Sequence, residues 1–252
     1  MKKLLFSTIL IFSLCFVQTS SAATLDLVLL IDGSGSIGTE DFQLQLNGYK
    51  NTFASGSFYD DYIDPSPYTA IRVSAFQFSD TVVEEIDWTL IEDNNDATNF
   101  GNMFTTTNFT YLNNYTNTSA AINAAITKID DSTNDRVIDI STDGEPYSSN
   151  GPEPARTNAL VSADNARAAG IKVNAIGIGG VDTTFLKELV GLDPLDTPTG
   201  FFVTADSFND FESAIQVKLG REITGTSPVP EPATMLFFGF GLISFAGILR
   251  AK

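Results

Sequence analysis

The sequence predicts an α/β protein with a single doubly wound, mostly parallel sheet, one antiparallel edge strand and helices on both faces. Two observations support this fold class. Short, nearly continuous apolar runs recur along the chain, as expected of strands buried on both faces. Segments with helical spacing of apolar residues lie between these runs, so strands and helices alternate. With 43% hydrophobic and 18% charged residues, the 252-residue chain can form a substantial core.

The expected strands are the apolar runs themselves. Four are well defined: Leu25–Ile31, Ile71–Phe78, Val137–Ile140 and Ile171–Ile178. The run Phe201–Thr204 is a weaker candidate for a further strand. Thr81–Ile86 follows the second run after a short turn, which predicts an antiparallel hairpin at the edge of the sheet.

Helical patterns occupy the segments between the strands. The expected helices are Thr39–Ser55, Ser119–Ile129, Pro154–Ala169, Thr183–Val190 and Phe208–Ile223. We expect Thr39 to cap the first of these helices, and Gly170 to end the third. The segment Asp93–Thr118 is rich in Asn and Thr. It is either a solvated surface loop with one short helix, or a loop that shapes a binding face at the carboxyl ends of the strands.

Charge and composition exclude several classes of function. The chain has 14 Lys and Arg against 31 Asp and Glu, a net charge of −17 and a pI near 4.1. Such a polyanion is repelled by nucleic acids and by acidic membrane surfaces. The chain has no histidine, and its single cysteine is Cys15. Catalytic systems that use His, and zinc sites of His and Cys, are therefore excluded, and any metal must be held by oxygen atoms.

Residues 1–23 have the features of a secretory signal peptide. The basic start MKK is followed by the apolar stretch LLFSTILIFSLCFV and by small residues that suit cleavage after Ala22 or Ala23. Because Cys15 would be removed with this segment, the mature protein is expected to function outside the cytoplasm without disulfide bonds.

The C-terminal end has the features of a membrane-associated segment. Residues 224–229 form an expected linker, and Pro230, Glu231 and Pro232 precede the apolar run Ala233–Leu249 and a basic end. The length of this apolar run is at the lower limit for a membrane-spanning helix. The basic residues that follow it would stay on the cytoplasmic side of the membrane. This is the only segment that we expect to contact a membrane.

The order of Pro-Glu-Pro, apolar run and basic end in residues 230–252 resembles the PEP-CTERM sorting signal of Gram-negative bacteria. The resemblance implies transient anchoring in the inner membrane and cleavage near Pro230, Glu231 and Pro232 by an exosortase. It also implies delivery to the cell surface or to an exopolysaccharide matrix. The alternative that the tail is kept as a plain membrane anchor stays open.

The stretch LLIDGSGSIG, residues 29–38, fits two kinds of binding loop. Its glycines have the G-x-G-x-x-G spacing of a dinucleotide-binding loop. However, Asp32 directly precedes them and would repel a pyrophosphate. The next convincing strand ends about 40 residues later, where a ribose-binding carboxylate is needed after about 20. The sequence therefore favours the second pattern, D-x-S-x-S, as a cation-binding loop.

Asp32, Ser34 and Ser36 place three oxygen side chains on alternate residues after a strand. A tight turn can direct them to one point, but a cation such as Mg²⁺ takes about six oxygen ligands. Further ligands are expected from the ends of neighbouring strands. Two segments are candidates, Tyr115–Ile122 with its hydroxyl groups and Val137–Glu145 with its acids.

These motifs, in this order, resemble the von Willebrand factor A domain and its metal-ion-dependent adhesion site. The family has D-x-S-x-S after its first strand, T-x-T-x-x-A before a helix and T-D-G after a later strand; the resemblance covers about residues 24–223. It implies that Thr116 and Asp143 complete the ligand set. The family often has two glycines before the threonine, whereas this chain has Asn114 and Tyr115.

The resemblance implies a binding module, not an enzyme. The implied cofactor is a divalent cation, with Mg²⁺ preferred over Mn²⁺ or Ca²⁺, and its last position is filled by an acidic group of a partner. That partner would be an acidic protein or polysaccharide on the cell surface or in the matrix. Two alternatives are a structural matrix protein with a vestigial site and a metal-dependent hydrolase with Glu145 as its base. Asp139, in the middle of a strand, is expected to be a buried partner or an edge residue and not a ligand.

Overall fold

A single sheet organises the structure. The computed structural model describes residues 23–129, 134–192 and 199–225. Its six strands lie in the order β3-β2-β1-β4-β5-β6, and only the pair β2 and β3 is antiparallel. The strands are β1 (Ala23–Asp32), β2 (Tyr68–Phe78), β3 (Val82–Ile91), β4 (Asp135–Thr142), β5 (Lys172–Ile178) and β6 (Phe202–Ala205). The predicted fold class is confirmed.

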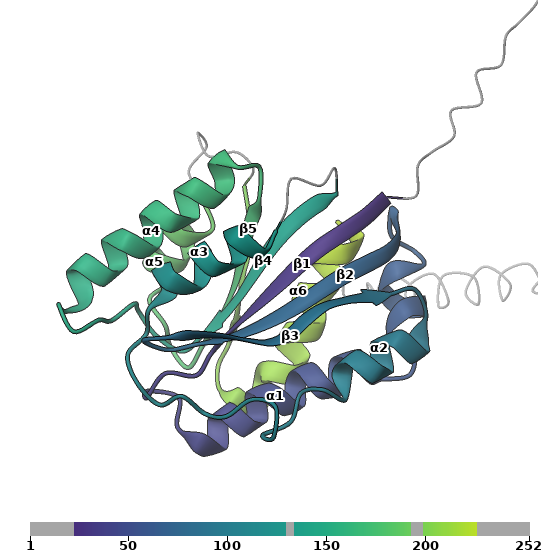
Figure 1. Ribbon diagram of the computed structural model, residues 1–252, viewed down its shortest axis with the longest axis horizontal. Coiled ribbons are helices and arrows are strands. Elements are labelled where there is room, and N and C mark those ends of the chain that lie inside the picture. The colour runs from purple at the N-terminus through teal and green to yellow at the C-terminus, as the bar shows by residue number, and fades with distance from the viewer. Residues whose placement is uncertain (1–22, 130–133, 193–198, 226–252) are drawn as a thin grey trace, which may run out of the picture.

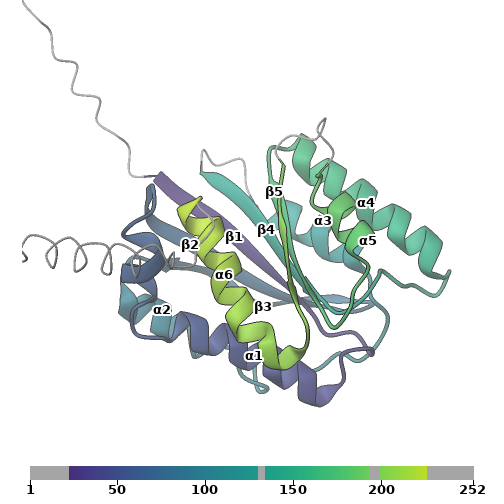
Figure 2. The ribbon, with the colours of Figure 1, turned by 180° about the vertical axis from the view of Figure 1, so that it is seen from behind.

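Helices cover both faces of this sheet. The α-helices are α1 (Thr39–Phe53), α2 (Asn94–Gly101), α3 (Thr118–Lys128), α4 (Pro152–Ala168), α5 (Thr183–Leu189) and α6 (Phe211–Thr224). One turn of π-helix, Tyr59–Ile63, and one turn of 3₁₀-helix, Phe208–Asp210, complete the set. Helices α1, α2 and α6 lie on one face, and α3, α4 and α5 on the other (Figures 1 and 2).

Each face of the sheet has its own hydrophobic core, and the central strand β1 contributes to both. Leu27, Leu29 and Ile31 belong to the core under α1, α2 and α6. Val28 and Leu30 alternate with them and belong to the core under α3, α4 and α5. Because successive side chains of a strand point to opposite faces, a strand buried on both sides must be apolar throughout.

The predicted elements agree with the observed ones within a few residues, but the expected cap of α1 is wrong. Thr39 is the first residue of the helix, and Gly38 precedes it at φ 77 without a side-chain cap. A glycine adopts this positive φ without strain, unlike a threonine. The backbone N–H of Gly38 instead donates to the hydroxyl group of Tyr111, at 2.8 Å. The predicted stop at Gly170 is confirmed, since α4 ends at Ala168 and Gly170 has φ 77.

The Asn/Thr-rich segment Asp93–Thr118 combines features of both expectations. It contains one short helix, α2, whose first turn is capped by the Asp93 carboxylate. It is not simply solvated, because Phe100, Phe104 and Phe109 are buried in the core beneath α1 and α6. These three rings anchor the segment, and its last residues are thereby held near the carboxyl ends of the strands.

The expected signal peptide, apart from Ala23, and the expected sorting segment lie outside the described residues. The same holds for Pro230, Glu231 and Pro232. Among the helices that the structure describes, none has the length and hydrophobicity needed to cross a bilayer.

Candidate metal centre

The candidate site begins where two neighbouring parallel strands end. The register of β1 and β4 pairs Ile31 with Ser141, so the next residues, Asp32 and Thr142, lie side by side. The Asp32 carboxylate is fully buried. One of its oxygens accepts a hydrogen bond from the Ser34 backbone N–H at 2.8 Å, and the other accepts one from the Thr142 hydroxyl group at 2.6 Å.

The loop after β1 connects Asp32 to the loop after β4. The hydroxyl oxygens of Ser34 and Ser36 lie 3.1 Å apart, and the Ser36 hydroxyl group donates to the Asp143 carboxylate at 2.8 Å. Ser34 is buried, Asp143 is partly buried and Ser36 is exposed. Four of the five predicted ligands therefore form one group of oxygen side chains that extends from the interior to the surface.

The fifth predicted ligand, Thr116, follows a loop whose backbone is bonded to the first loop of the site. Gly35 donates to the Asn114 carbonyl oxygen at 2.7 Å, and Asn113 donates to the Gly33 carbonyl oxygen at 2.9 Å. Thr116 is buried. Among the described residues, its hydroxyl group makes no hydrogen bond to the other four predicted ligands.

Two glycines of the first loop, Gly33 and Gly38, have structural roles of their own. A Cβ atom on Gly33 would lie 2.2 Å from the amide nitrogen of Gln77, so no larger residue fits there without displacing that side chain. Gly38 provides the positive φ at the start of α1. The G-x-G-x-x-G pattern therefore does not require a bound phosphate.

Burial raises the pKa values of both acids of the site. Burial raises the pKa of Asp32 to about 7; hydrogen bonds from Thr142 and Ser34 oppose this rise, and the nearby Asp143 charge adds to it. Burial also raises the pKa of Asp143, against the hydrogen bond from Ser36. Among the described residues, no lysine or arginine forms an ion pair with either acid. The two carboxylates thus lack a positive partner from the chain.

Several supporting residues were missed by the sequence interpretation. Gln45 of α1 donates to the Asp32 carbonyl oxygen at 2.9 Å and accepts from the Ser141 hydroxyl group at 2.6 Å. The Tyr111 hydroxyl group donates to the Ser34 carbonyl oxygen at 2.8 Å. Thr142 does have a local sequence signal, because it is the first residue of the T-D-G motif. Gln45 and Tyr111 carry no local sequence signal, because their role depends on how distant segments pack.

The donor set fits a hard divalent cation. It consists of oxygen atoms only, two from carboxylates and the rest from hydroxyl groups, as such cations prefer. The described residues contain no cluster of three or more His, Cys, Asp or Glu side chains, so a site of many acids is not formed there. In addition, the buried Thr118 hydroxyl group, two residues after Thr116, has no hydrogen-bond partner in the described part of the chain.

Two other acids near the motifs have partners of their own. Asp139 is fully buried and pairs with Lys218 of α6, so of the two expectations for this residue the buried partner is confirmed. Glu145, the candidate base of a hydrolase, lies 3.1 Å from the Arg156 guanidinium group. Arg156 also pairs with Asp182 and Glu188. Glu145 therefore belongs to a surface ion-pair network.

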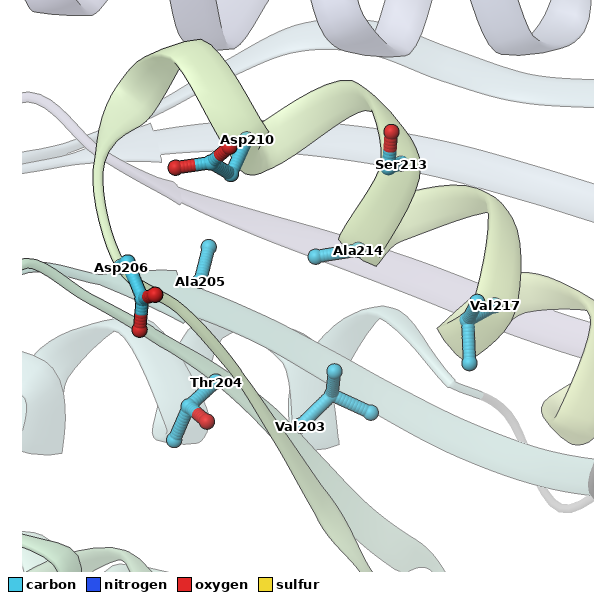
Figure 3. Close-up of a pocket in the computed structure, with 8 residues that line it drawn as sticks. All are labelled: Val203, Thr204, Ala205, Asp206, Asp210, Ser213, Ala214 and Val217. Carbon is cyan, nitrogen blue, oxygen red and sulfur yellow. The ribbon is translucent and has the colours of Figure 1, made fainter.

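A separate pocket of about 370 Å³ lies between β6 and α6 (Figure 3). Val203 and Val217 form part of its wall, and Asp206 and Asp210 lie at the loop between the two elements. The elements that build it contain none of the predicted ligands. The pocket is therefore not part of the candidate metal centre.

Comparison with protein families assigns the greater part of the chain. The family model described as "Protein of unknown function (DUF1194)" matches residues 22–227. The chain belongs to this family. The PEP-CTERM protein-sorting motif matches residues 228–251, as the order of residues at that end predicts. The chain is therefore an exported cell-surface protein of a Gram-negative bacterium. No curated protein matches the sequence.

Solved structures share the fold at low sequence identity. Proximal thread matrix protein 1 of the mussel byssus is 15% identical, with a TM-score of 0.57 over 81% of this chain and 47% of that one. The vWF domain of the type V pili tip protein Mfa5 from Porphyromonas gingivalis is 12% identical, with a TM-score of 0.52 over 84% and 99%. The manganese-loaded TRAP protein of Plasmodium vivax is 22% identical, with a TM-score of 0.52 over 78% and 73%.

These similarities show that the chain has the fold of a von Willebrand factor A domain. It spans about half of the mussel protein or less, so that protein contains further parts. A second structure of the mussel protein is described as having a zinc-occupied MIDAS motif. By name, the mussel neighbour is a thread matrix protein and the Porphyromonas gingivalis neighbour is a pilus tip protein, and two of the neighbouring structures are described with a bound metal.

Proposed function

We propose that this chain is an exported, metal-dependent adhesion module. In this proposal Asp32, Ser34, Ser36, Thr116 and Asp143 hold a divalent cation, with Mg²⁺ preferred over Mn²⁺ or Ca²⁺. The cation binds an acidic group of a partner on the cell surface or in the surrounding matrix. The metal-loaded neighbours with the same fold support a divalent cation here.

One observation carries the proposal: the Asp32 carboxylate is fully buried and has no positive partner among the described side chains. Isolated buried charges are strongly unfavourable, and proteins neutralise them by pairing, protonation or metal binding. Asp32 lies at the base of a group of oxygen donors that opens to the surface at Ser36. A cation reaching that group from solvent would provide the missing positive charge.

The charges of the site also favour a contact with an acidic partner. Asp32 and Asp143 together carry two negative charges when ionised, which only balance a divalent ion, and the three hydroxyl groups add none. A storage site would use more carboxylates. A cation held with so little negative charge would coordinate an anionic oxygen of a partner. Ser36 and Asp143, the more accessible ligands, mark the side from which such a group would approach.

The rest of the chain fits delivery of such a module to the surface. We propose that residues 1–23 are removed as a signal peptide and that residues 24–223 form the binding domain. Residues 224–229 then serve as a linker, and residues 230–252 anchor the protein in the inner membrane until an exosortase cleaves near Pro230, Glu231 and Pro232. The sorting motif over residues 228–251 supports this processing.

The proposal predicts binding to the host's own matrix fraction that depends on metal and on Thr116. Binding should be lost in chelator, return with Mg²⁺ or Mn²⁺, and fall at least about tenfold in Thr116→Ala, which removes one ligand without changing the charge. Thr116→Ser, which keeps the hydroxyl group, should retain most of the binding. Retention of the full chain on the immobilised matrix measures each value.

Thr110→Ala provides the matched control, because Thr110 is exposed in the same segment but is not a predicted ligand. It should bind like the unmodified protein. Binding that persists in chelator would contradict the proposal and would direct attention to contacts made by the segment Asp93–Thr118 alone.

A further inference from the structure

Two exposed tyrosine side chains lie next to the candidate metal centre. Tyr115 is 43% exposed and Tyr147 is 47% exposed, and their rings contact each other with centroids 5.7 Å apart and planes tilted by 41°. They come from different loops, one before α3 and one after β4. Large aromatic side chains that stay exposed side by side often mark a binding surface.

The backbone fixes this pair relative to the proposed ligands. Thr116 and Tyr147 form an isolated antiparallel bridge with two hydrogen bonds, of 3.0 and 2.9 Å. Residues that face each other in such a bridge have neighbouring side chains. The Tyr147 ring is therefore beside Thr116, and Tyr115 precedes Thr116 directly in sequence. The backbone therefore keeps the pair close in the chain to one of the proposed ligands.

The two segments that carry the pair are uncharged in a strongly acidic chain. Despite the 31 acidic residues of the protein, no charged residue occurs between Asp96 and Lys128, or between Glu145 and Glu153. Both segments are instead rich in Asn, Ser, Thr and Tyr. Their amide and hydroxyl groups can both donate and accept hydrogen bonds. This combination of aromatic faces and neutral hydrogen-bonding groups matches the surface of a sugar, which has C–H groups on its ring faces and hydroxyl groups on its edges.

We propose that Tyr115 and Tyr147 form a stacking platform for a sugar ring, and that the ligand of this site is a uronic-acid unit of a polysaccharide. This inference rests on the proposed metal site. In a uronic acid the carboxylate is attached directly to the ring, so the ring stays close to any cation that the carboxylate binds. On the protein, the backbone bridge between Thr116 and Tyr147 likewise keeps a tyrosine close to a proposed ligand of the cation.

Titration of the full chain with a galacturonic-acid oligosaccharide, in the presence of Mg²⁺, tests this inference. Tyr115→Leu and Tyr147→Leu keep an apolar side chain but remove the aromatic face. We expect each to weaken oligosaccharide binding about tenfold, while the affinity for Mg²⁺, measured separately by calorimetry, changes less than about twofold. Phenylalanine at either position should preserve most of the binding. Leu90→Ala, a change of a 46% exposed residue on β3, should have no effect.

The outcomes separate this inference from the proposed function. If the protein binds Mg²⁺ but not the oligosaccharide, or if the leucine variants bind it normally, the sugar platform is wrong and the metal site stands. A glutamate oligopeptide that binds more tightly than the oligosaccharide, with the same dependence on the tyrosines, would identify a protein partner and would also overturn the inference. If the chain binds no divalent cation, the proposed function itself fails.

Discussion

Two aspartates on neighbouring strands are equally buried but differ in their partners. Asp32, at the end of β1, and Asp139, in the middle of β4, are both inaccessible to solvent. Asp139 pairs with Lys218 of α6, which is also fully buried and lies 2.7 Å from Glu222. Asp32 is surrounded by hydroxyl groups and a backbone N–H, with no basic partner in the described residues.

The comparison shows that burial of an acid does not by itself identify a metal ligand. In the middle of the sheet no ion can enter from solvent, and the chain provides its own cation. At the carboxyl ends of the strands the loops open to solvent, and positive charge can come from outside. The chain has only 14 basic residues against 31 acids, so few acids can have a basic partner. One of these basic residues, Lys218, pairs with Asp139, a structural position, whereas Asp32, a candidate functional position, has no such partner among the described residues.

The largest expected effect comes from removing the internal cation. Lys218→Met leaves Asp139 and Glu222 buried without a positive partner, and breaking a buried ion pair costs about 3–5 kcal/mol. Urea unfolding should show a decrease of that size in the free energy of unfolding. Lys187→Met, at an exposed position of α5, is the matched control and should change it by less than about 0.5 kcal/mol. A small effect of Lys218→Met would mean that the two regions do not differ as described.

The two regions should also differ in how pH and metal affect stability. Burial raises the pKa of Asp32 from 3.8 to about 7, and burial with the nearby Asp139 charge raises that of Glu222 from 4.5 to about 8. Both acids therefore bind more protons in the folded chain than in the unfolded one. The stability of the metal-free protein should fall as pH rises from about 4 to about 8, by about 1.4 kcal/mol for each unit of pKa shift.

Thermal unfolding across this pH range, in chelator and in Mg²⁺, measures the two contributions. Mg²⁺ should remove the Asp32 contribution, because the cation favours the ionised carboxylate. Glu222→Gln should remove the contribution at higher pH, with or without metal. A pH profile that is the same in chelator and in Mg²⁺ would argue against a cation at Asp32.

The smallest expected effect is on the affinity for metal, when the charge of Asp32 is removed. Asp32→Asn keeps a hydrogen-bond acceptor for Ser34 but removes the charge, so divalent-ion affinity should fall at least about tenfold, or about 1.4 kcal/mol. The metal-free variant should be at least as stable as the unmodified protein at pH 8, because the variant lacks the buried unpaired charge. Glu40→Gln, an exposed change on α1, is the control for both calorimetry and unfolding. Equal affinities in Asp32→Asn and the unmodified protein would place any metal elsewhere.

Local patterns were sufficient for most of the fold. The apolar runs predicted five parallel-type strands and the edge hairpin, because a strand covered on both faces must be apolar along its length. The errors have physical causes. The cap at Thr39 was predicted from a preference that a glycine with positive φ overrides. The segment Asp93–Thr118 lacks a regular hydrophobic period, so the burial of its three phenylalanine rings could not be predicted.

The sequence by itself determined the residue types of the candidate site, since Asp32, Ser34, Ser36, Thr116 and Asp143 stand in short motifs whose spacing can be recognised along the chain. Only the tertiary structure decided which acid has a cation of its own and which does not. Lys218 meets Asp139, and Tyr115 meets Tyr147, because distant segments are brought together by strand order and helix packing. Those contacts depend on the sum of many non-local interactions, and no local spacing records them.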